Sequence, residues 1–150
     1  MYNLKYVINN RKVFKPLQLC DFMPSIEEHI KNFKMFLTDI EEKIRMNVIV
    51  ERQKLVGFGV SEASANLFAV FLLKNKLIDP GFNVNHRFFV SEKRAKETFP
   101  FDFPMKEEVI SLLVKIDSLR NRLCYGKEKD AKEVNEDLSL LYKLKEMIEK

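Results

Sequence analysis

The residues best suited to chemistry stand close together in the stretch Ser118–Gly126. Arg120 can hold a phosphate group through its planar, permanently charged guanidinium. Asn121 offers an amide that donates and accepts hydrogen bonds, and Tyr125 offers a phenol that can donate a hydrogen bond or stack on a base. Asn121 and Tyr125 are four residues apart, so they share one helical face if the helix continues that far. Arg120, Asn121 and Tyr125 are therefore our candidate catalytic residues.

Positive charge surrounds this stretch. Arg122, Lys127 and Lys129 follow within a few positions and are our candidate nucleic-acid-binding residues. The other interpretation is structural, because cations commonly stabilise the negative end of a helix. The whole chain is modestly basic, with a net charge of +4 and a pI near 9.0. This balance permits a polyanionic partner without requiring one.

Spacing in the sequence indicates neither a metal site nor a cofactor site. His29 is expected on the outer side of an amphipathic helix, and His86 in a connection, where it would make a polar contact. Cys20 and Cys124 are too far apart to indicate a zinc motif or a disulfide framework, and they favour a reducing cytoplasm. No phosphate-binding glycine loop or nucleophile elbow occurs. We expect no metal and no cofactor.

Helical periodicity predicts an all-α fold with four main helices and a short one. The first helix opens at a capping box, in which Ser25 and Glu28 satisfy free backbone amides. The other helices are expected at about 51–77, at about 91–98, from near Pro104 to 125–126, and from Asp130 to the last residues. No linker is evident, so we expect 1–150 to form a single up-and-down helical bundle. Residues 1–22 leave two alternatives open, a hairpin around Asn9 and Asn10 or a loose arm.

Two apolar segments have more than one interpretation. From Leu55 to Leu73 only Glu62 is charged, so the run is nearly long enough to cross a bilayer. Its small and polar residues favour the central helix of a bundle instead, and we expect no membrane partner. Glu62 itself is expected at the rim of that helix or in a contact between helices, with a buried functional carboxylate as the alternative. The three phenylalanines of 99–104 are expected to anchor an extended strap in the core, with aromatic ligand binding as the alternative.

The segment Arg120–Gly126, at the end of a long helix and followed by an acid-capped terminal helix, resembles the signature of the HEPN superfamily (the higher eukaryote and prokaryote nucleotide-binding domain). That signature is an arginine, four residues of which the first is often asparagine, and a histidine. The order of helices is similar over about residues 25–149. The resemblance implies a HEPN-like bundle that forms a homodimer.

HEPN members with the full signature are metal-independent ribonucleases, often toxins, whose arginine and histidine meet in a dimer cleft. By position Arg120 is the motif arginine, Asn121 is its polar neighbour, and Tyr125 stands where the histidine belongs. The resemblance implies RNA or a nucleotide as ligand and a nucleotidyltransferase-type protein as a candidate partner. In toxin members that partner modifies a tyrosine two positions beyond the histidine. Lys127 occupies this position here, which argues against such a modification.

The replacement of histidine by tyrosine separates our hypotheses. Histidine titrates near pH 6.5 and tyrosine near pH 10, so a tyrosine base costs roughly 4 kcal/mol at neutral pH. The leading hypothesis is a dimeric protein that binds RNA or a nucleotide in a basic cleft at the end of the third long helix, with weak or no nuclease activity. One alternative is a metal-independent endoribonuclease toxin of a toxin–antitoxin pair, with Tyr125 in the histidine's role. The other is a non-catalytic protein-interaction module in which Arg120 and Asn121 bond across a dimer and Tyr125 is buried.

Overall fold

The computed structural model describes residues 8–9, 12–13 and 25–150. Within 25–150 it contains five α-helices and one 3-10 turn, which are α1 (Ile26–Arg45), α2 (Gln53–Lys74), η2 (His86–Phe89), α3 (Glu92–Thr98), α4 (Lys106–Cys124) and α5 (Ala131–Ile148). The prediction of four main helices and a short one is confirmed, whereas η2 was not predicted. Two short strands, β1 (Ile8–Asn9) and β2 (Lys12–Val13), pair antiparallel, as in the hairpin alternative. The rest of the expected N-terminal arm lies outside the described residues.

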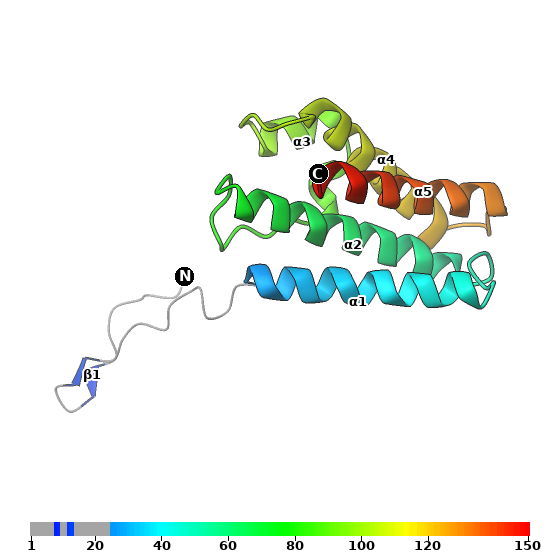
Figure 1. Ribbon diagram of the computed structural model, residues 1–150, viewed down its shortest axis with the longest axis horizontal. Helices are drawn as coiled ribbons and strands as arrows, with labels where there is room; N and C mark the ends of the chain where they lie inside the picture. Colours follow the sequence, from blue (N-terminus) through cyan, green and yellow to red (C-terminus); the bar gives the residue numbers. More distant parts are fainter. Residues whose placement is uncertain (1–7, 10–11, 14–24) are drawn as a thin grey trace.

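Helix α2 is the centre of the bundle. It packs against α1, α4 and α5, while α3 packs against the start of α4. α1 and α4 run antiparallel to α2, and α5 runs parallel to it (Figure 1). By length and mean hydropathy, 1.6 over its most apolar window, α2 could cross a membrane, but 72% of that window is buried inside the fold. A helix that is apolar on most sides fits this central position.

Local side-chain caps start three of the α-helices, which are α1, α3 and α5. Ser25 and Glu28 form the predicted capping box, with bonds of 3.1 and 3.2 Å between their side chains and backbone amides. Asp130 caps α5 by accepting a hydrogen bond from the Glu133 amide. The predicted start of α4 near Pro104 is two residues early, because Met105 adopts a left-handed backbone conformation with φ of 58°.

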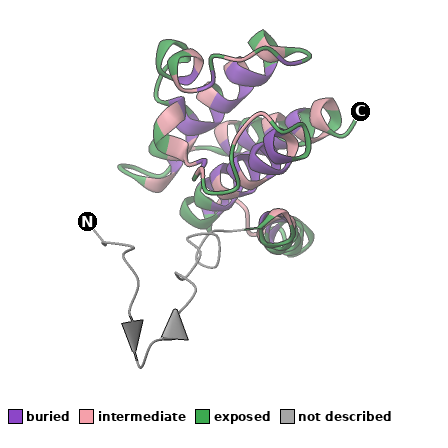
Figure 2. Cartoon of the chain, turned by 90° about the vertical axis from the view of Figure 1, so that its left-hand side faces the viewer, coloured by how far each residue is buried: buried purple, intermediate pink, exposed green. Residues whose placement is uncertain are grey.

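The core lies where the long helices face one another, and exposed residues cover the outside (Figure 2). The expectation that His29 faces solvent is wrong. His29 is buried, and its Nδ1 lies 2.8 Å from Oδ1 of Asn66 on α2. The amide satisfies the ring nitrogen, so burial of this histidine costs little. Glu62, in the middle of α2, is half-buried.

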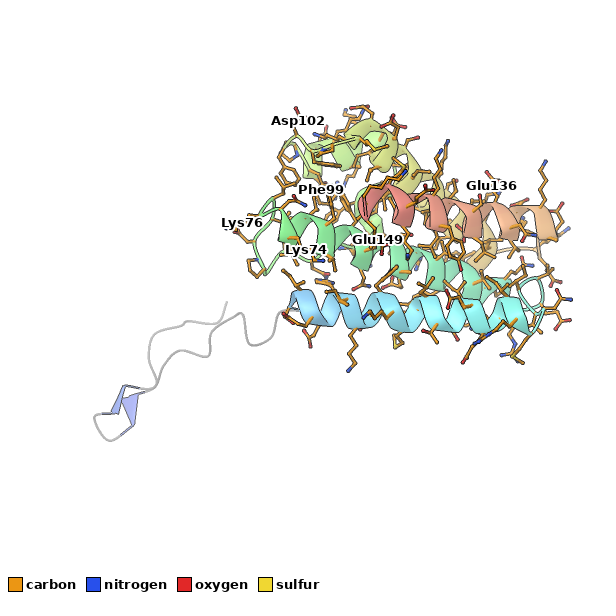
Figure 3. The ribbon with its side chains drawn as sticks, in the orientation of Figure 1. Lys74, Lys76, Phe99, Asp102, Glu136 and Glu149 are labelled. Carbon is orange, nitrogen blue, oxygen red and sulfur yellow. The ribbon has the colours of Figure 1, made fainter. Side chains whose placement is uncertain are left out.

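A cluster of phenylalanines fastens the segment 82–103 to α2. Phe99 is fully buried at its centre (Figure 3), with ring centroids 5.2 to 6.2 Å from its aromatic neighbours. Those neighbours are Phe68, Phe82, Phe88, Phe89 and Phe101. Phe103 is also buried and packs on α2. The predicted anchoring of the strap by phenylalanines is confirmed.

A glycine lets α4 approach α2 closely near the end of α4. A Cβ added at Gly57 would lie only 2.9 Å from Cβ of Leu123. Leu123 and Cys124 therefore sit against the backbone of α2. This contact sets the position of the end of α4, and of the motif residues there, relative to α2.

Candidate functional site

The candidate site lies where α4 ends. The helix stops at Cys124, and Tyr125 takes an extended conformation (φ −125°, ψ 150°) while its amide still donates to the carbonyl of Asn121. Gly126 follows with φ of +82°, which favours glycine, as the sequence predicted. Because the last helical turn ends one residue early, Tyr125 does not continue the helical face of Asn121. The expectation that these two side chains share a helical face is wrong.

Arg120 stands at the border between the core and solvent. Its side chain is half-buried, and Nε is shielded from solvent without a hydrogen-bond partner among the residues that the structure describes. A buried donor that lacks an acceptor costs about 1–3 kcal/mol. Because Nε is sealed from solvent, an anionic ligand can meet only the exposed part of this half-buried, permanently charged side chain. Arg120 can hold an anion through that part.

Asn121 is exposed and belongs to a short polar network. Its Nδ2 donates to Oδ2 of Asp117, one turn earlier on α4, at 3.5 Å. The other carboxylate oxygen of Asp117 lies 3.1 Å from Nδ1 of His86 in η2. Sequence reasoning missed Asp117, and it treated His86 only as an unspecified polar contact. Spacing along α4 links Asp117 to Asn121, but nothing local indicates the contact with His86.

Tyr125 is exposed to solvent, with 63% of its surface accessible. A phenol in that position can stack on a base or donate a hydrogen bond. Lys127 is exposed in the following loop. The structure thus places one exposed aromatic side chain and one exposed cation directly after the end of α4.

The other two predicted cations have structural contacts. The Nη2 atom of Arg122 lies 2.7 Å from Oε1 of Glu133, and this ion pair links the end of α4 to α5. Lys129 is held through its backbone, because Gln53 donates to its carbonyl at 3.0 Å and accepts from its amide at 2.7 Å. The side chain of Gln53 therefore braces the loop that follows the motif, which the sequence did not indicate.

A hollow of about 390 Å³ adjoins the end of α4. It lies between the start of α2 and the α4–α5 loop and is lined by Glu51, Arg52, Gln53, Lys54, Leu55, Leu123, Gly126 and Glu128. Its charges are mixed, with two cations against two carboxylates. The hollow offers room beside the motif but shows no preference for one sign of charge.

Cys124 is a poor candidate for a nucleophile. Its thiol lies 3.3 Å from the carbonyl oxygen of Lys54. Burial raises the pKa of the Cys124 thiol, although the nearby Arg120 guanidinium acts in the opposite direction. The thiol therefore stays protonated at neutral pH, and the reactive thiolate is scarce. Among the described residues, no three His, Cys, Asp or Glu side chains gather where they could hold a metal ion.

Comparisons with known proteins add no relative to this picture. No protein-family model, no curated protein and no solved structure matches the chain.

Proposed function

We propose that the protein binds RNA or a nucleotide at the end of α4, as a dimeric HEPN-like bundle with weak or no nuclease activity. The observation that carries the proposal is Arg120, whose permanently charged side chain is half-buried at the border between core and solvent, with no partner for Nε among the described residues. Guanidinium groups recognise phosphate oxygens through such donors. Arg120 would hold a phosphate, and Asn121 would orient the ligand beside it.

The surroundings of Arg120 support an anionic ligand with bases. Tyr125 is exposed and can stack on a base. Arg52 and Lys54, at the start of α2, and Lys127, after α4, are exposed around the same end of the bundle. Glu51 and Glu128 are exposed at this end too, so the local charge is mixed, and it is the net charge of +4 that permits association with a polyanion.

Tyr125 is the reason to propose weak or absent cleavage. Without a metal, RNA cleavage needs a group that accepts the proton of the 2′-hydroxyl. A tyrosine is a far weaker proton acceptor than a histidine at neutral pH. The ribonuclease-toxin alternative requires Tyr125 in that role, and it predicts growth arrest on expression that Tyr125→Phe relieves.

A second copy of the chain is the proposed partner. Leu55 and Phe58 are exposed on α2, and at a spacing of three they share a helical face near the start of the helix. Leu55 also lines the hollow beside the motif, so an apolar contact here would bring two copies together near the end of α4. Sedimentation equilibrium distinguishes the dimer from a monomer.

Binding to a single-stranded RNA oligonucleotide, measured by fluorescence anisotropy, tests the proposal. Affinity should fall steeply between about 50 and about 200 mM salt, as expected when phosphates are neutralised. Arg120→Ala should weaken binding by about tenfold or more, because a charge-assisted bond is lost. Arg94→Ala, which removes an exposed arginine on α3, is the matched control and should bind as the unmodified protein does.

Two results would sink the proposal. One is a protein without salt-sensitive affinity for RNA or for nucleotides. The other is equal affinity of the Arg120→Ala and Arg94→Ala variants. Melting temperatures of both variants show whether any loss reflects unfolding rather than a missing contact.

A further inference from the structure

The polar network behind Asn121 contains a histidine with the geometry of a proton acceptor. Asp117 is almost fully buried, with 4% of its side chain exposed, whereas the imidazole of His86 is 28% exposed. The carboxylate oxygen lies 3.1 Å from Nδ1 of His86. A carboxylate accepts, so Nδ1 carries the proton and donates it to this bond. In the neutral imidazole the remaining nitrogen, Nε2, carries the lone pair that can accept a proton.

The backbone around His86 is held firmly. Asn85 caps η2 by accepting a hydrogen bond from the amide of Arg87 at 3.0 Å. Phe89, three residues on, is buried in the phenylalanine cluster and stacks on Phe99. His86 therefore stands between a capped turn and a core anchor, and its imidazole is preorganised instead of sampling many positions.

The same face of α4 presents the network and the motif arginine. Asp117, Arg120 and Asn121 are related by spacings of three and four, which place neighbouring side chains on one helical surface. Asn121 donates to the carboxylate that orients His86. Arg120 is about 4.5 Å further along the helix axis than Asp117. Arg120 thus lies about one turn along α4 from the carboxylate that bonds to His86.

We infer that His86, which lies outside the motif, is the proton acceptor of this site and replaces the histidine that Tyr125 displaces. Asp117 acts as the positioning residue, because it fixes the tautomer and the direction of the imidazole. The inference rests on the proposed function, since it requires RNA to bind at Arg120. His86 is then the group that turns such binding into slow cleavage.

The reaction balances without a metal or an added reagent. Nε2 of His86 takes the proton of a ribose 2′-hydroxyl, and the 2′-oxygen forms a bond to the adjacent phosphorus. The bond from phosphorus to the 5′-oxygen breaks, and the departing oxygen takes a proton from water, whose hydroxide then takes back the proton held by Nε2. The products are a 2′,3′-cyclic phosphate and a 5′-hydroxyl, while Arg120 holds the charge on the phosphoryl oxygens.

The experiment follows single-turnover cleavage and binding of one RNA oligonucleotide, in the presence of a metal chelator. The unmodified protein should cleave the RNA to cyclic phosphate and leave the all-deoxyribose oligonucleotide intact. His86→Gln should slow cleavage about 100-fold or more, the usual contribution of a general base, with a much smaller loss of affinity. His29→Gln is the matched control, because His29 is the other histidine and bonds to Asn66 elsewhere in the bundle.

The outcomes separate this inference from the proposed function. If the unmodified protein does not bind RNA, the proposed function fails, and the inference fails with it. If it binds without cleaving, or if His86→Gln cleaves at the unmodified rate, the inference alone is overturned, and His86 only fastens η2 to α4. If His86→Gln does not fold, Asp117→Asn carries the same test, since it keeps the shape of the side chain and should also slow cleavage.

Discussion

Among the described residues, Asp137 has a pKa far from the ordinary value of a carboxyl group. It lies on the buried face of α5, and both carboxylate oxygens are sealed from solvent without a hydrogen-bond partner among the described residues. Burial, with a smaller contribution from the charge of Glu136, raises the pKa of Asp137 from 3.8 to about 8. Glu136 itself is on the outer side of α5 (Figure 3). Asp137 is therefore neutral in the folded protein at pH 7.

The raised pKa predicts a stability that falls as pH rises. Between about pH 4 and about pH 8 the unfolded chain releases a proton that folded Asp137 keeps, so the free energy of unfolding decreases over that window. Asp137→Asn removes this dependence and should stabilise the protein at pH 7 by a few kcal/mol (on the order of 4 at most), with little gain at pH 4. Urea unfolding at both pH values measures the difference. Glu136→Gln is the control, and equal stability of Asp137→Asn and the unmodified protein at pH 7 would contradict the prediction.

The residues of the candidate site divide into those that the sequence indicates and those that only the fold brings in. Arg120, Asn121 and Tyr125 were found because they are neighbours in a motif. His86 and Asp117 are 31 positions apart, and their contact depends on where η2 packs against α4. The prediction that His29 faces solvent is wrong for the same reason, because its partner Asn66 is on another helix. Contacts between elements leave no local pattern from which they could be predicted.

At the scale of the elements, the two glycines of α2 make a matched pair. Gly59→Ala would place its Cβ 3.5 Å from the Ile40 side chain, an ordinary contact, whereas Gly57→Ala would place it 2.9 Å from Cβ of Leu123. Gly59→Ala should stabilise by about 0.5–1 kcal/mol, because alanine favours helix. Gly57→Ala should destabilise overall, since overpacking costs about 1–3 kcal/mol. Thermal unfolding of the two variants tests this, and a gain in stability for Gly57→Ala would contradict the close approach of α2 and α4.

Helix ends were predictable where the side chain that caps them is local. Ser25, Ser91 and Asp130 accept hydrogen bonds from amides three residues on, and each was identified as the start of a helix. The ends that differ depend on the backbone instead. Met105 adopts a left-handed conformation that its residue type does not announce, so α4 begins later than predicted. Tyr125 leaves the helix one residue before the predicted stop.

At the scale of the whole molecule, the phenylalanine cluster joins the irregular segment 82–103 to the long helices. Phe99→Ala should cost about 3–5 kcal/mol, as is typical when a large buried aromatic is truncated. The Phe99→Ala substitution should also raise the rate of backbone amide hydrogen exchange in η2 and α3 before it raises that rate in α2. Phe101→Ala is the control, because its half-buried ring at the edge of the cluster should cost less. Similar losses for both variants would show that Phe99 is not the central anchor.

The all-helical architecture over residues 25–150 could be predicted because amphipathic spacing marks α1, α4 and α5, local caps start α1 and α5, and α2 stands out as a long apolar run. The central place of α2 followed from its apolar composition. The arrangement of 82–103 did not follow, because it depends on ring-to-ring packing among residues that are far apart in the sequence.

The two hydrogen bonds between Gln53 and the backbone of Lys129 have a consequence for how the chain acquires its site during synthesis. They join residues 76 positions apart, and they brace the loop that follows the motif. A ribosome adding about 5–20 residues per second exposes α1 and α2 several seconds before Lys129 emerges. Until then Gln53 has no partner on that loop, and α2 lacks the covering that α5 provides. A nascent chain that stops before Lys129 thus presents an apolar α2 without an assembled site, so any affinity for RNA arises only late in translation.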